Sequence, residues 1–153
     1  MKEEFYTYLK NIGISDVAQT KVEEIYNEIL FLYNNINIDD ILITNVTNDG
    51  HVEWQSLWFF NEDLVIECKN FLSQQADYDI ASLNNKIIYY NIKKGNYNLN
   101  DAPRQNSYIN ITILINNGHS SCNLMATGAN CPYVKHISQK YFLKKIDTSL
   151  YSE

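Results

Sequence analysis

The chain has little positive charge, and almost all of that charge comes from lysine. Arg104 is the only arginine among 153 residues, and 12 Lys and Arg stand against 18 Asp and Glu, for a formal net charge of −6. Neutralising a nucleic-acid backbone needs clustered Lys and Arg, so this composition argues against nucleic-acid binding. An acidic protein suits a basic partner better.

Long apolar runs and a secretory signal are also missing from the pattern. No uninterrupted apolar stretch approaches the roughly 20 residues that span a bilayer. The first five residues, MKEEF, carry acidic residues where a secretory signal has basic ones followed by an apolar core. We therefore expect a cytoplasmic protein that has no membrane partner.

The chain contains few cysteines, and their number is odd. The three cysteines are Cys68, Cys122 and Cys131. An odd count without a secretory signal argues against a disulfide framework and for reduced thiols. Free cysteines are usually buried, and we expect the same here.

The apolar residues of the first 35 positions recur with a helical period. The first predicted helix covers 3–12 and ends at Gly13, and Ser15 is a good N-cap for the second. The buried stripe of that second helix is predicted to consist of Val22, Ile25, Ile29 and Leu32.

After Asn35 the apolar period changes to two, which predicts strands. Asn/Asp–Gly turns at 48–50 and 116–118 predict hairpins, and 61–63 predicts a further turn. The predicted strands cover 41–47, 51–60, 64–69, 86–93, 108–115 and 121–127. Segment 72–85 is ambiguous between a short helix and an irregular crossover, and 94–107 is the longest predicted loop.

The last predicted strands and the last helix define a core face. Alternation predicts that two groups of residues face inward: Ile109, Ile111, Ile113 and Ile115 on one strand, and Cys122, Leu124 and Ala126 on the next. Asn130 can cap a final helix that has Pro132 in its first turn and Val134, Ile137 and Tyr141 on its buried stripe.

These elements predict a single α+β domain over residues 1–153. It comprises two N-terminal helices, a mainly antiparallel curved sheet of about six strands, and one C-terminal helix. The order of elements over roughly residues 40–145 resembles the bacterial pleckstrin-homology-like architecture, which implies a partial barrel closed by a helix. The resemblance includes no residue motif, so no functional residue is carried over from it.

One segment has the pattern of a metal-dependent nuclease. Leu64–Asn70 resembles the third strand of nucleases built on a Pro-Asp…(Asp/Glu)-x-Lys pattern, because Glu67 and Lys69 share one face of a strand. With Asp49 upstream, these residues could hold Mg²⁺ while the lysine orients the attacking water. No Pro precedes Asp49, and that fold needs a helix and a parallel strand after Lys69. The alternative is an exposed Glu/Lys face on an ordinary strand.

Four nitrogen and sulfur ligands have a spacing that could enclose zinc. They are His119, Cys122, Cys131 and His136. Known structural sites pair their ligands more closely, so buried thiols and surface histidines are the alternative. Cys131 at a helix start, with His136 five residues on, is also a candidate nucleophile. No motif in the chain demands a cofactor.

The strand predicted over 51–60 is apolar on both faces. Trp54, Trp58 and Phe60 share one face, and Leu57 and Phe59 share the other. A central strand buried on both sides explains this pattern, and an aromatic surface for a partner explains it as well. The sequence leaves both interpretations open.

The function is inferred mainly from missing motifs. The chain has no phosphate-binding glycine loop, no Ser or Cys with a convincing base, and no basic stripe. We expect a binding protein of the inhibitor or immunity type that occludes a basic toxin or enzyme by charge complementarity. The alternatives are the metal-dependent nuclease and a small-ligand or nucleotide-binding domain. The residues expected to contact the basic partner are Asp39, Asp40, Asp49, Glu53, Glu62, Asp63, Trp54 and Trp58.

Overall fold

The computed structural model describes residues 1–44, 56–83, 87–96, 107–115 and 120–143. The chain is divided into two compact units. Unit 1 consists of Met1–Asn61 and Val65–Ile80, and unit 2 of Glu62–Leu64 and Ala81–Glu153. Within the described residues, no helix is both long enough and apolar enough to cross a bilayer.

Unit 1 begins with the two predicted helices. Helix α1 covers Glu3–Asn11 and α2 covers Asp16–Leu32. The Ser15 hydroxyl accepts a hydrogen bond from the Ala18 amide at 3.2 Å, so the predicted N-cap is confirmed. Val22, Ile25 and Ile29 are buried as predicted, whereas Leu32, the last residue of α2, is 59% exposed.

The first sheet follows in the order β1-β2-β3-β4. Its strands are β1 (Asp40–Thr44), β2 (Ser56–Phe60), β3 (Leu64–Lys69) and β4 (Asp77–Ser82). The predicted turn at 61–63 joins β2 to β3, which pair antiparallel with Trp58 opposite Glu67. The ambiguous segment 72–85 proves to hold an edge strand, β4. The hairpin predicted at 48–50 lies outside the described residues.

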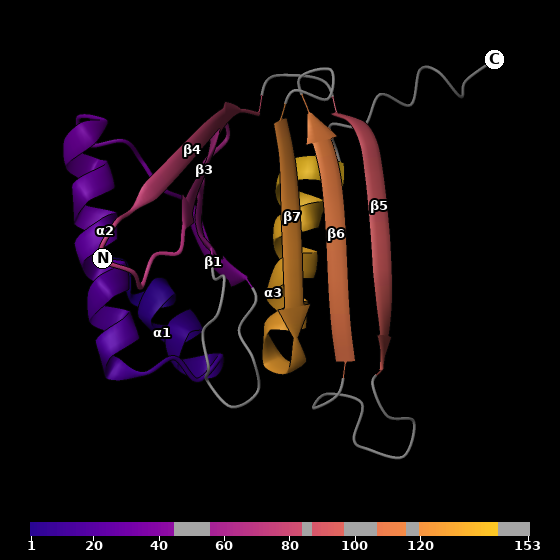
Figure 1. The fold of residues 1–153 in the computed structure, drawn as a ribbon, viewed down its shortest axis with the longest axis horizontal. Helices are drawn as coiled ribbons and strands as arrows, with labels where there is room; N and C mark the ends of the chain where they lie inside the picture. Colours follow the sequence, from indigo (N-terminus) through magenta and orange to yellow (C-terminus); the bar gives the residue numbers. More distant parts are fainter. Residues whose placement is uncertain (45–55, 84–86, 97–106, 116–119, 144–153) are drawn as a thin grey trace. The chain divides into compact units, whose positions relative to one another are not determined.

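The helices cover one face of this sheet (Figure 1). The Tyr26 ring of α2 lies 6.4 Å from the Phe59 ring of β2, and the Tyr8 hydroxyl of α1 accepts a hydrogen bond from the Ile43 amide at 2.9 Å. All five residues of β2 are buried, so β2 is a central strand with both faces covered. Trp58 is 2% exposed and donates its indole hydrogen to Thr44 Oγ1 at 3.1 Å. This residue therefore belongs to the core.

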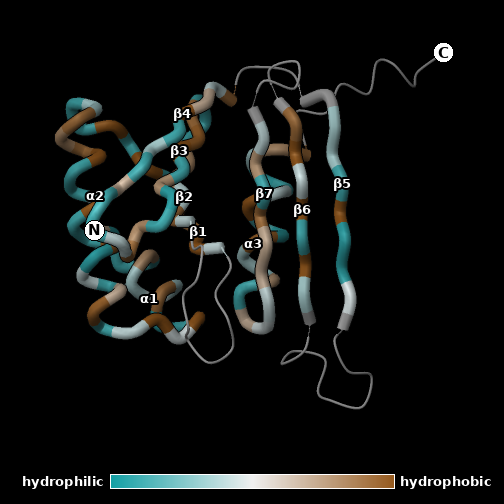
Figure 2. The backbone as a smooth tube through the Cα atoms, in the orientation of Figure 1, coloured by the Kyte–Doolittle hydropathy of each residue, from teal (hydrophilic) through white to brown (hydrophobic). Residues whose placement is uncertain are grey.

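Unit 2 contains a second sheet, in the order β5-β6-β7. Its strands are β5 (Ile87–Asn96), β6 (Ser107–Ile115) and β7 (Ser120–Thr127). Ile109, Ile111 and Ile113 are buried on one face, together with Cys122, Leu124 and Ala126, as the alternation predicts. The same alternation is visible along β6 in Figure 2. The hairpin predicted at 116–118 lies outside the described residues.

A helix packs on the buried face of β6 and β7. A 3₁₀ turn (η2, Gly128–Asn130) leads into α3 (Cys131–Ile137), which continues as a π-helical turn (η3, Ser138–Phe142). Val134, Ile137 and Tyr141 are buried, as predicted. Asn130 is the N-cap residue of α3, as predicted, but its backbone is already helical and its side chain makes no capping hydrogen bond.

The α+β class is confirmed, and the sheet prediction needs correction. The described strands form two antiparallel sheets of four and three strands, rather than one curved sheet of about six strands. A pattern of alternating residues marks each strand but does not say which strand it pairs with, because pairing depends on contacts far apart in the chain. The prediction of a single domain over 1–153 stays a prediction.

Candidate functional site

The clearest gathering of polar groups in unit 1 surrounds the edge strand β4. Glu67 and Lys69 lie on one face of β3, as predicted, and Asp77 and Asp79 follow on β4. Lys69 Nζ lies 2.5 Å from Asp79 Oδ2, and Ser56 Oγ donates a hydrogen bond to Glu67 Oε2 at 2.5 Å. Each of the two nuclease-like residues thus already has a partner within unit 1.

Glu67 is partly buried, and its surroundings shift the pKa of its carboxyl. Burial raises the pKa of the Glu67 carboxyl above its usual range, while the Ser56 hydrogen bond and the charge of Lys69 oppose the rise. Asp79 and Asp77 add to it by like-charge repulsion. The pKa of Lys69 is raised, chiefly by its hydrogen bond to Asp79. The lysine is therefore a firmly charged partner of Asp79.

The other face of β3 and β4 meets helix α2. Cys68 is fully buried there, and burial raises the pKa of its thiol to about 11, while a hydrogen bond with Tyr78 opposes the shift. The Tyr78 hydroxyl donates its hydrogen to Glu28 Oε2 at 3.2 Å. Burial raises the pKa of the Tyr78 hydroxyl, and the nearby Cys68 and Glu28 raise it further. Tyr78 thus ties β4 to both β3 and α2.

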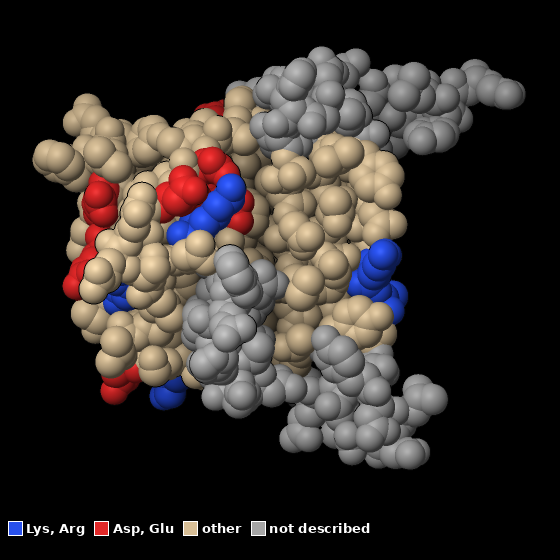
Figure 3. All heavy atoms as spheres, viewed as in Figure 1, with Lys and Arg blue, Asp and Glu red and all other residues tan. Residues whose placement is uncertain are grey.

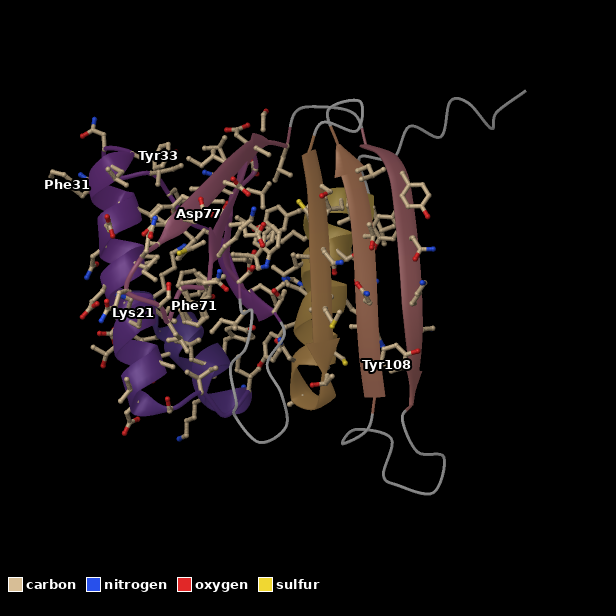
Figure 4. All side chains as sticks on the ribbon, viewed as in Figure 1. Lys21, Phe31, Tyr33, Phe71, Asp77 and Tyr108 are labelled. Carbon is tan, nitrogen blue, oxygen red and sulfur yellow. The ribbon has the colours of Figure 1, made fainter. Side chains whose placement is uncertain are left out.

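Carboxylates therefore flank β4 on both sides. We call Glu28, Glu67, Asp77 and Asp79 the acidic edge. Figure 3 shows acidic side chains grouped around lysines over unit 1, and Figure 4 labels Asp77 beside β4. Charged residues on an edge strand generally hinder its pairing with a second chain.

Each metal site suggested by the sequence includes one residue that the structure does not describe. Asp49 and His119 lie outside the described residues. Cys122 and Cys131 are buried, Cys131 with its thiol 3.6 Å from the Ala126 carbonyl, whereas His136 is exposed on α3. Among the described residues, no three His, Cys, Asp or Glu side chains are grouped so as to hold a metal ion. In addition, β4 follows β3 directly, without the helix that the nuclease pattern requires.

Four of the acidic residues predicted to contact the partner lie at the start of β1 and just after the end of β2. Asp39 and Asp40 lie at the start of β1 in unit 1, where the Asn37 amide donates to Asp39 Oδ1 at 2.6 Å. Glu62 and Asp63 are exposed in the β2–β3 turn, which belongs to unit 2. Glu53 and Trp54, like Asp49, lie outside the described residues. Asp40 pairs with Phe60, and the Asp39 amide donates to the Phe60 carbonyl at 2.8 Å, so Asp39 and Asp40 lie beside the end of β2 that leads into Glu62 and Asp63.

Sequence reasoning missed Tyr78 and the two aspartates of β4. The sequence pattern that could have predicted β4 is the alternation Asp77-Tyr78-Asp79-Ile80. It has the period of a strand but little apolar character. Edge strands are often this polar, because one side of them faces solvent.

The negative charge is also unevenly divided along the chain. The sequence ranges of unit 1 carry 13 acidic and 4 basic residues, for a net charge of −9. Those of unit 2 carry 5 acidic and 8 basic residues, for +3. The overall net charge of −6 is thus the sum of a negative net charge on unit 1 and a positive net charge on unit 2.

Comparison with known proteins adds no family to this description. No protein-family model, curated protein or solved structure matches the chain. The function is therefore argued from its residues.

Proposed function

We propose that this protein is a binding protein of the inhibitor type that occludes a basic protein partner through unit 1. The observation that carries the proposal is the concentration of charge: a net charge of −9 belongs to unit 1, including the acidic edge along β4. Such a field steers a basic partner to the surface and raises the rate of association.

An exposed aromatic residue provides an anchor in the same unit. Phe31 is 85% exposed near the C-terminal end of α2, and in Figure 4 it points away from the helix. It follows Glu24 and Glu28 at spacings of seven and three, so the three residues share one stripe of α2. Exposed aromatic side chains often supply a large share of binding energy once they are buried by a partner.

The first experiment captures the partner from cells that make this protein and measures association by surface plasmon resonance. The partner is expected to be basic, and the association rate should fall as salt rises through the physiological range. Replacing Glu24→Lys together with Asp77→Lys should slow association about tenfold or more at low salt. The Phe31→Ala variant should instead dissociate faster, whereas Val17→Ala, at another exposed position of α2, should not.

A second pair of charge reversals tests which surface of the protein contacts the partner. Glu62→Lys with Asp63→Lys alters the net charge by the same amount but lies in the β2–β3 turn. If this pair slows association and the Glu24/Asp77 pair does not, the contact surface is wrongly assigned to α2 and β4. An acidic partner, or association independent of salt, contradicts the proposal as a whole.

The nuclease alternative is tested with the same protein. It requires cleavage of DNA or RNA in Mg²⁺ or Mn²⁺ that is lost in both Glu67→Gln and Lys69→Gln. The Ser56–Glu67 and Lys69–Asp79 contacts favour a structural role for these residues. We therefore expect no metal-dependent cleavage by the wild-type chain.

A further inference from the structure

Unit 2 contains a groove along its edge strand. Helix α3 and the η3 turn pack over β6 and β7, and β5 is the outer strand beside them (Figure 1). Tyr90, Ile92 and Lys94 alternate along β5 on the face that carries the buried isoleucines of β6. Because the helix does not cover this part of the sheet fully, a cavity of about 310 Å³ remains, which we call the β5 groove.

The floor and walls of the β5 groove are largely apolar. Ile109 and Ile111, which line it from β6, are 3% and 1% exposed, whereas Ile92 on β5 is 46% exposed. The hydroxyls of Tyr90 and Ser138 are hydrogen-bonded to each other across the groove, which joins β5 to η3. An isoleucine left half exposed above a buried apolar floor is a surface that an apolar ligand would cover.

Two ammonium groups complete the lining. Lys94 comes from β5 and Lys135 from α3. Neither lysine forms an ion pair with any residue in the part of the chain that the structure describes. The sequence of unit 2 carries a net charge of +3. The groove remains about 310 Å³ with both lysine side chains in place, so their stems do not fill it.

We propose that the β5 groove binds a small amphipathic carboxylate, with its apolar chain against Ile92 and Ile111 and its head group at Lys94 and Lys135. The volume lies at the lower end of the roughly 300–1,000 Å³ typical of small-molecule sites, which fits a medium-length chain. The charge complementarity selects an anion, and this site is independent of the acidic surface of unit 1.

Decanoate, used below its micelle-forming concentration, is the probe, and calorimetric titration of the full chain is the measurement. Decanoate should bind saturably, decanol about tenfold or more weakly, and acetate not at all, because affinity needs both the chain and the charge. Lys94→Gln with Lys135→Gln should weaken decanoate binding about tenfold or more. The matched pair Lys93→Gln with Lys140→Gln, which changes the net charge equally, should leave binding unchanged.

A second pair of variants tests the apolar part of the groove. Ile92→Trp should abolish binding by filling the groove, whereas Tyr89→Trp, on the opposite face of β5, should not. Both positions are about half exposed, and circular dichroism confirms that each variant is folded. Equal binding by the wild type and Ile92→Trp, or by decanol and decanoate, overturns the proposal.

Other occupants of the groove give different results. Decyl phosphate binding far more tightly than decanoate would assign the groove to a phosphate head group and overturn the carboxylate. A chain ending at Leu143 that binds decanoate far better than the full chain would assign the groove to the protein's own C-terminal segment. A dimer in sedimentation experiments that Ile92→Trp disrupts and decanoate does not would assign it to a second copy. Each of these results contradicts the proposal.

Discussion

Cys68 shows how burial controls the chemistry of one side chain. Its thiol is fully buried beside Tyr78, with a pKa of about 11 against an ordinary value of 9.0. A thiol whose pKa is raised by folding contributes stability that is complete below pH 9 and is lost as the pH rises through 11. Such a thiol is also a poor nucleophile, because the thiolate is the reactive form.

We predict that the wild type loses about 2 kcal/mol more unfolding free energy than Cys68→Ala between pH 7 and pH 10.5. The variant has no thiol to ionise in either state, so it lacks this contribution. Urea unfolding of both proteins at the two pH values measures the difference. Equal losses would mean that Cys68 does not hold its proton more tightly in the folded protein.

The raised pKa of Glu67 predicts a similar dependence of stability on pH, at lower pH. Burial raises the pKa of its carboxyl, so the native state favours the protonated form, and stability is lost as the pH rises through the folded-state pKa. Glu67→Gln can still accept the Ser56 hydrogen bond but cannot ionise. Relative to the wild type, this variant should be more stable at pH 7 than at pH 4.

The measurement is urea unfolding of both proteins at each pH, with Glu62→Gln as the control because Glu62 is exposed in a turn. The control should show a smaller change with pH relative to the wild type. If the Glu67→Gln and wild-type stabilities run parallel between pH 4 and pH 7, the carboxyl of Glu67 is not destabilised by burial.

At the scale of elements, β6 is the strand on which the core of unit 2 is built. Ile111 is 1% exposed in its middle, paired with Ile92 on β5 and Leu124 on β7. Ile111→Ala should cost about 2 to 5 kcal/mol of unfolding free energy, because truncation leaves a cavity in a packed face.

Met125 on β7 is the matched control. It lies on the opposite face of the same sheet and is 37% exposed, so Met125→Ala should cost less than about 1 kcal/mol. Denaturant unfolding of the two variants compares the faces directly. If the Met125 variant is the less stable of the two, the inward face of the sheet is wrongly assigned.

Elements with a strong local pattern were predicted well. The Ser15 cap, the α2 stripe and the alternating isoleucines of β6 all depend on residues close together in sequence, and the structure confirms them. The predictions failed where the outcome depends on the surroundings. Asn130 has the residue type of a cap, but the preceding 3₁₀ turn makes its backbone helical. The edge strand β4 alternates with the period of a strand, but it has too little apolar character to be recognised from the sequence.

At the scale of the molecule, two strands cross the boundary between the units. β3 begins at Leu64 in unit 2 and continues in unit 1, and β4 passes from Ile80 in unit 1 to Ala81 in unit 2. A strand that loses its pairing at one end is weakened along its length, so unfolding of one unit should destabilise the other.

We therefore predict that the chain unfolds in a single cooperative transition, as expected for one domain. Differential scanning calorimetry should give equal calorimetric and van't Hoff enthalpies, and Ile111→Ala should lower the melting temperature of the whole transition. Two resolved transitions, with only one of them shifted by Ile111→Ala, would show that the units unfold independently.

The sequence by itself determined the α+β class, the N-terminal helices, most strands and the inward face of β6, because each follows from residue spacing along one element. Tertiary structure alone decided that the strands form two sheets, that Lys69 pairs with Asp79, and that Lys94 and Lys135 line one groove. It also divided the charge of −6 into an acidic and a basic unit. These features join residues far apart in the chain, and local patterns carry no information about which distant segments meet.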